Sequence, residues 1–96
     1  MFARVRVTNG VPEKVDEGVR QFRDVVLPSY QDVPGFNGGY MLVDRVKGKQ
    51  IGVTLWATEA HLHATEATSQ RLRTAGSQAA GGAVQSVEIY EVVVQP

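Results

Sequence analysis

The chain opens with a strict alternation of side chains that is typical of a β-strand. This alternation covers residues 2–8 and assigns successive side chains to opposite faces. One face holds Ala3, Val5 and Val7, and the other holds Phe2, Arg4, Arg6 and Thr8. The dipeptide Asn9-Gly10 then breaks the pattern, so we expect the strand to end before it.

The next segment has apolar residues at helical spacing. They form a single stripe that consists of Val15, Val19, Phe22, Val26 and Tyr30. Pro12 lies near the start of this helix, where its missing N–H costs nothing. Pro28 is expected to kink or end the helix, because it cannot donate a hydrogen bond to the carbonyl of Asp24.

Four further elements follow a turn at residues 31–35. The patterns predict strands over residues 36–46 and 50–57 joined by a hairpin, a helix from 59 to about 75, and a last strand over 84–94. Thr58 is a good N-cap for the second helix. The Gly-rich stretch 76–83 is expected to be mobile.

The order β-α-β-β-α-β is that of an α+β, ferredoxin-like fold with a four-stranded antiparallel sheet, and we expect residues 1–96 to form one domain. Two helices can cover one face of this sheet, yet the strands carry apolar residues on both faces. We therefore expect a homodimer through the second face. Arg4 and Arg6 would lie near that interface, where Glu88 or Glu91 could neutralise them, unless both arginines extend to the sheet edge.

Composition and charge exclude several classes of function. The chain has 96 residues, of which 43% are hydrophobic and 21% charged, as in ordinary globular proteins. Ten basic and ten acidic residues give no net charge, which argues against nucleic-acid and membrane-surface partners. There is no cysteine, and hence no disulfide or thiolate metal site.

The start of the chain has two arginines but no apolar stretch of a signal peptide, and no apolar run approaches the ~20 residues of a membrane span. A cytoplasmic protein is expected.

Several short motifs resemble antibiotic biosynthesis monooxygenase (ABM) domains of the dimeric α+β barrel superfamily. They are Pro34-Gly35-Phe36, Gly39-Tyr40, a strand ending in Trp56, and Thr58-Glu59-Ala60 at a helix start. The resemblance covers the whole chain in element order and length. It implies the fold and a dimer. The family includes cofactor-independent oxygenases, haem-degrading enzymes and members without established activity, so the resemblance alone implies no single reaction.

The haem-degrading branch combines an Asn within the first strand, a Trp at the end of the third strand and a haem-ligating His midway along the second helix. Trp56 matches, but the early Asn9 falls past the expected strand. His61 and His63 lie in the first two turns of the helix, earlier than the family's ligand. One match in three disfavours haem binding.

The oxygenase branch implies a pocket between sheet and helices. Cofactor-free oxygenation needs a substrate that ionises easily, a group that stabilises its oxyanion and a dry cavity. The leading hypothesis is a monooxygenase of a small aromatic phenol or quinol without metal, flavin or haem. The candidate catalytic residues are Trp56, Tyr40 and His63, and the candidate substrate-binding residues are Arg23, Phe22, Met41 and Leu62.

Each candidate also has a structural interpretation. Trp56 is a candidate core residue, Tyr40 a candidate dimer contact, and His63 a candidate surface partner of Glu59. His61 and His63 lie roughly 200° apart around a helix and cannot share a metal. The second helix has few bulky side chains, so either sheet residues fill the space beneath it or a cavity remains, with residues 76–83 as a lid. The alternative function is a non-catalytic small-molecule-binding or stress-related protein.

Overall fold

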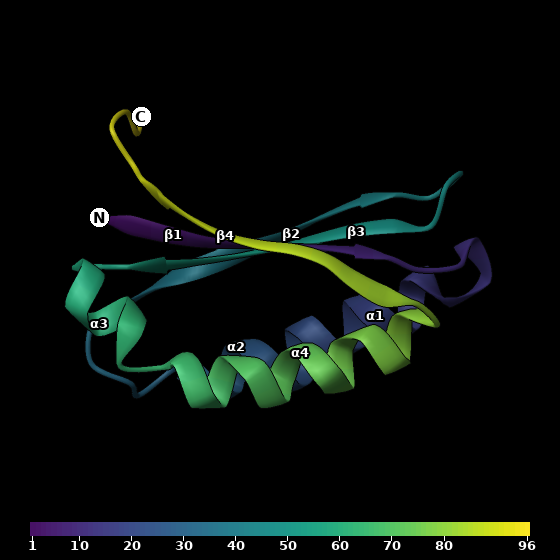
Figure 1. Cartoon of the computed structure of the whole chain (residues 1–96), viewed down its shortest axis with the longest axis horizontal. Helices are drawn as coiled ribbons and strands as arrows, with labels where there is room; N and C mark the ends of the chain where they lie inside the picture. Colours follow the sequence, from purple (N-terminus) through teal and green to yellow (C-terminus); the bar gives the residue numbers. More distant parts are fainter.

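The computed structural model describes residues 1–96 and has the β-α-β-β-α-β order that the sequence predicts. Its strands are β1 (Phe2–Asn9), β2 (Phe36–Asp44), β3 (Lys49–Trp56) and β4 (Ala83–Glu91). They form one antiparallel sheet in the order β2-β3-β1-β4, and both helical segments lie on the same side of it (Figure 1). The expected α+β, ferredoxin-like fold is confirmed. The expected end of the first strand was one residue short, because β1 includes Asn9.

The first helical segment is continuous from Pro12 to Tyr30 but changes its winding. Its pieces are η1 (Pro12–Lys14), α1 (Val15–Gln21), the π-helical η2 (Phe22–Val26) and α2 (Leu27–Tyr30). The segment therefore continues past Pro28 to Tyr30. The turn before the proline is widened, and the N–H of Leu27 bonds to the carbonyl of Phe22. This wider turn gives the proline ring room, while the predicted stripe still faces the core.

The second helical segment differs from the prediction at its end. It consists of α3 (Glu59–His63), which starts at the expected Thr58 cap, and α4 (Glu66–Ala80). Residues 76–80 are thus helical, and the expected mobile lid over 76–83 is wrong. The helix stops at Gly81, whose φ of +70° is the left-handed conformation that glycine adopts most easily. None of these helices is long and apolar enough to cross a lipid bilayer.

The central strand β1 turns its arginines toward the helices. Arg4 bonds to groups at the α3–α4 junction, and the guanidinium of Arg6 lies against Gly76 of α4. The expectation that Arg4 and Arg6 lie near the outer sheet face, beside Glu88 or Glu91, is therefore wrong. The smaller side chains of the alternation face outward instead, because the small residues of α4 leave space for two long side chains.

The outer sheet face is apolar and not covered by any helix of the chain (Figure 1). Cross-strand pairs place Tyr40 beside Val53 and Leu42 beside Ile51. Tyr40 is 61% exposed and Leu42 is 54% exposed. Large side chains this exposed, on an otherwise regular sheet, form the sort of patch that is typical of protein interfaces.

The core on the helix side is anchored by an aromatic cluster at one end of the sheet. The Trp56 ring centroid lies 5.0 Å from that of Tyr30, edge to face, and 5.3 Å from that of Phe36. The indole N–H of Trp56 donates to the hydroxyl of Thr54 (3.1 Å). Leu62 from α3 closes the cluster and is fully buried. This cluster forms one side of the region in which the candidate site lies.

Candidate functional site

A cavity of about 30 Å³ lies between the helices and the sheet and is partly open to solvent. Its walls come from β1, β3, the π-helical turn, α2 and α4. The lining residues are Arg4, Arg6, Phe22, Val26, Tyr30, Gly52, Thr54, Ser69, Leu72 and Arg73. The volume accommodates about two water molecules or the polar head of a larger ligand.

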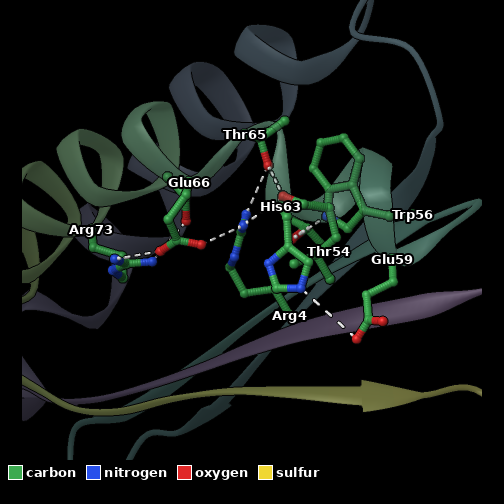
Figure 2. A network of polar contacts seen from close by, with 10 residues as sticks. Arg4, Thr54, Trp56, Glu59, His63, Thr65, Glu66 and Arg73 are labelled. Atoms are coloured by element: carbon green, nitrogen blue, oxygen red, sulfur yellow. Dashed lines mark hydrogen bonds and ion pairs between the residues drawn. The ribbon is translucent and has the colours of Figure 1, made fainter.

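Arg4 forms the inner polar wall of this cavity and is only 3% exposed. Its guanidinium donates to the Thr65 hydroxyl (3.1 Å), the Leu62 carbonyl (2.9 Å) and a Glu66 carboxylate oxygen (3.0 Å). All three acceptors lie at or beside the junction of α3 and α4. Arg4 is thus paired in charge and fixed in position (Figure 2).

Glu66 joins two of the arginines that line the cavity. Its second carboxylate oxygen lies 3.3 Å from Arg73, which also donates to the hydroxyl of Ser69 (2.9 Å). Partial burial of Glu66 disfavours ionisation, but Arg4 and Arg73 together outweigh it and hold the pKa of Glu66 below its ordinary value. Arg73 is therefore not part of a solvated helix end, because this side chain is only 18% exposed.

Arg6 has no comparable partner. It takes part in no side-chain hydrogen bond or ion pair, and its Nε is buried without an acceptor. Burial, followed by the charge of the neighbouring Arg73, lowers the pKa of Arg6. An arginine with a lowered pKa remains charged at neutral pH. The site therefore holds an uncompensated positive charge.

Two glycines make the space that this guanidinium occupies. A Cβ at Gly52 would lie 2.7 Å from one terminal nitrogen of Arg6, and a Cβ at Gly76 would lie 2.7 Å from the other. Both glycines stand inside regular elements, β3 and α4, where glycine costs stability. At the helical position the cost is about 1 kcal/mol relative to alanine. We call the space between Gly52 and Gly76 the Arg6 slot.

The chemistry available in the cavity is anion stabilisation. Three arginines and one neighbouring carboxylate leave an excess of positive charge, beside the aromatic rings of Phe22 and Tyr30. None of the lining residues is Asp, Glu or His. No group of three His, Cys, Asp or Glu side chains comes together anywhere in the structure. The lining can hold an anion but offers no ordinary general base at neutral pH.

Four of the seven candidate residues from the sequence lie at or behind this cavity. Phe22 lines it, while Trp56 and Leu62 are buried in the adjoining cluster and Met41 packs against that cluster. Trp56 is completely buried, so it contributes to the cavity through Tyr30 rather than through its own exposed surface.

The other three candidates lie elsewhere. Tyr40 is on the outer sheet face. The ring of His63 is exposed on α3, with Nε2 3.8 Å from a Glu59 carboxylate oxygen (Figure 2). Arg23 is exposed, bonds to Asp24 at 2.8 Å and borders a separate, shallow hollow beside the edge strand β2. The structure does not bring these three side chains together.

Comparison of whole sequences yields uncharacterized relatives. The chain is 32% identical over 92 residues to the uncharacterized protein Rv2557 of Mycobacterium tuberculosis, which covers 96% of the chain. It spans 41% of the length of that relative. No protein-family model matches the chain.

Comparison of structures finds a consistent fold. The monooxygenase ActVA-Orf6 of Streptomyces coelicolor, solved with nanaomycin D, has a TM-score of 0.75 at 18% identity, over 99% of this chain and 91% of that one. The haem degrader MhuD of M. tuberculosis, solved with two haems in its active site, has a TM-score of 0.75 at 17% identity, over 100% and 99%. A mutant of the cofactor-independent oxygenase SnoaB of Streptomyces nogalater has a TM-score of 0.68 at 14% identity, over 98% and 94%. The expected resemblance to ABM structures is thereby confirmed for the fold.

Proposed function

We propose that the protein is a cofactor-independent monooxygenase of a small aromatic phenol or quinol. The observation that carries this proposal is the cavity between helices and sheet, in which aromatic rings adjoin an excess of buried positive charge. The folds of ActVA-Orf6 and SnoaB, named as a monooxygenase and a cofactor-independent oxygenase, support it.

The excess positive charge of the cavity suits the difficult step of cofactor-independent oxygenation, which is ionisation of the substrate. A substrate that reacts with O₂ without a cofactor must first become an electron-rich anion, and guanidinium groups stabilise the resulting oxyanion. One oxygen atom then forms a carbonyl on the substrate, and the other leaves as water with the two hydrogens that the substrate loses. Since the lining offers no ordinary base, the cavity promotes ionisation by lowering the pKa of the bound substrate.

Ligand entry must widen the cavity. Pockets for organic ligands usually measure about 300 Å³ or more, ten times the volume found here. Leu72 and Arg73 lie on α4, whose small neighbours, such as Ser69, leave room for their side chains to shift. We infer that the bound state differs from the free state in these side chains.

A homodimer through the outer sheet face is part of the same proposal. The exposed apolar side chains of that face, among them Tyr40 and Leu42 on the edge strand β2, support it. A partner seated there would bury these side chains and leave the cavity on the opposite face free.

One observation favours the alternative of a non-catalytic binding protein, namely the lack of Asp, Glu and His in the lining. Haem is disfavoured by the position of the histidines, since neither His61 nor His63 lines the cavity.

Oxygen uptake distinguishes these functions. Wild-type protein, treated with a chelator, should consume O₂ above the buffer rate with an anthrone or a neutral quinol. Arg6→Met should reduce kcat/KM by about 10- to 100-fold, because it removes the unpaired positive charge that favours the anionic form of the bound substrate. The matched control Arg71→Met removes the same charge from the exposed side of α4 and should leave uptake unchanged. A panel of anthrones and quinols that gives no uptake, although the ligands bind, would establish the binding-protein alternative.

A further inference from the structure

Arg6 is the one charge of the cavity that is partly buried and that the protein itself leaves unpaired. Arg4 and Arg73 share Glu66, whereas Arg6 forms no ion pair within the protein and its Nε is buried without an acceptor. Its side chain also crosses from β1 to α4 and lies in the Arg6 slot, where it would contact a Cβ at either glycine. The guanidinium of Arg6 is thus held in position, while no group of the protein pairs with its charge.

Stability alone does not explain this arrangement. A buried charge without a partner is unfavourable, and an apolar side chain of similar length would fill the same space without that cost. The protein adds a second unfavourable feature, because Gly76 lies in the middle of α4. The only atoms within 4 Å of a Cβ at this position belong to the Arg6 guanidinium. A side chain at this helical position would therefore collide with Arg6.

The surroundings define what would pair with Arg6. The hydroxyls of Thr54 and Ser69 and the guanidinium of Arg73 line the same cavity, and the rings of Phe22 and Tyr30 border it. A planar carboxylate matches a guanidinium with two parallel hydrogen bonds. The volume of about 30 Å³ suits such a head group while the aromatic remainder displaces flexible side chains.

We propose that Arg6 in its glycine slot is the recognition residue for the carboxylate of a hydroxyaromatic acid, with Arg73 as the second cation. This inference rests on the proposed function for the role of the hydroxyl group, and it names the substrate class as hydroxyaromatic carboxylates. Arg4 remains paired with Glu66 and positions the α3–α4 junction.

Isothermal titration calorimetry with a matched pair of ligands tests the proposal. The probes are 3-hydroxy-2-naphthoate and its neutral amide, 3-hydroxy-2-naphthamide, under argon so that no turnover occurs. Wild-type protein should bind the acid at least about tenfold more tightly than the amide. Arg6→Met should abolish this preference, whereas Arg71→Met should preserve it.

Thermal unfolding distinguishes a role of Arg6 in ligand recognition from a role in the stability of the protein. Arg6→Met should no longer prefer 3-hydroxy-2-naphthoate. In the absence of ligand its Tm should stay the same or rise, because the variant removes an unpaired charge that is partly buried. Gly76→Ala should also keep or raise Tm and weaken acid binding by about tenfold, since the added methyl group displaces the guanidinium.

The outcomes are distinct from those of the oxygen-uptake experiment. Equal binding of acid and amide by wild type, or unchanged acid binding by Arg6→Met, would overturn the inference even if anthrones are oxidised. Selective acid binding without any oxygen uptake would support the inference and refute the monooxygenase proposal. A lower Tm for Arg6→Met with retained acid preference would show that Arg6 is structural and overturn the inference as well.

Discussion

Trp56→Ala is expected to destabilise the protein by about 3–5 kcal/mol, a large share of the total for a domain of this size. The side chain is fully buried, packs on Tyr30 and Phe36, and donates its indole N–H to Thr54. Its removal leaves a cavity and an unpaired hydroxyl. Urea unfolding followed by far-UV circular dichroism measures the change as a lower transition midpoint at an unchanged slope.

Trp56→Phe is the control, because it keeps a ring in the cluster and loses only the hydrogen bond and part of the volume. It should cost clearly less than the alanine variant. Equal stability of wild type and Trp56→Ala would contradict the packing described for this end of the sheet. The expected instability also makes Trp56→Ala unsuitable as a test of catalysis.

Leu42→Asp is expected to convert the proposed homodimer into a monomer. Leu42 lies in the exposed apolar patch of the outer face, beside Ile51 of β3, and a carboxylate there would have to be buried unpaired in the interface. Sedimentation equilibrium at micromolar concentration should show a dimer for wild type and a weakening of association by about 100-fold or more for the variant.

Val46→Asp is the matched control for this substitution. Val46 is 87% exposed in the turn between β2 and β3, away from the patch, so the variant should remain a dimer. A wild-type monomer, or a dimer that Leu42→Asp leaves intact, would refute association through this face.

The fold was predictable because local patterns and element order agree. The alternation in β1, the Thr58 cap and the stripe that ends at Tyr30 each occur as predicted. Helix ends were predicted less well, since Gly76 and Gly81 look alike in sequence. In the structure only Gly81 has the positive φ of a helix terminus, and Gly76 provides room for a side chain from β1.

The site was predicted less completely, and β1 shows why. Alternation identifies two faces but does not say which face meets the helices. Hydrophobicity favoured the face of Val5 and Val7, whereas the structure places Arg4 and Arg6 beneath α4. The sequence did contain one signal for the correct face, namely side-chain volume. A helix as poor in bulky residues as α4 requires long side chains from the sheet to fill the space between them.

Catalytic and binding roles that were predicted from residue type alone had no such support from side-chain volume. Tyr40, His63 and Arg23 are chemically suitable, but their positions depend on the sheet face and helix face that each occupies. The decisive group, Arg6, stands out only when its missing partner and its two glycine neighbours are seen in three dimensions.

The most direct test of the central claim observes the Nε–H group of Arg6 itself. In a ¹⁵N–¹H correlation spectrum of the arginine side chains, the signal that disappears in Arg6→Met identifies this group. Its Nε has no acceptor in the free protein. Titration with 3-hydroxy-2-naphthoate should shift this signal saturably and slow its exchange with water, while the signal of Arg71 stays in place. An Arg6 signal that does not move while the naphthoate binds would contradict the account.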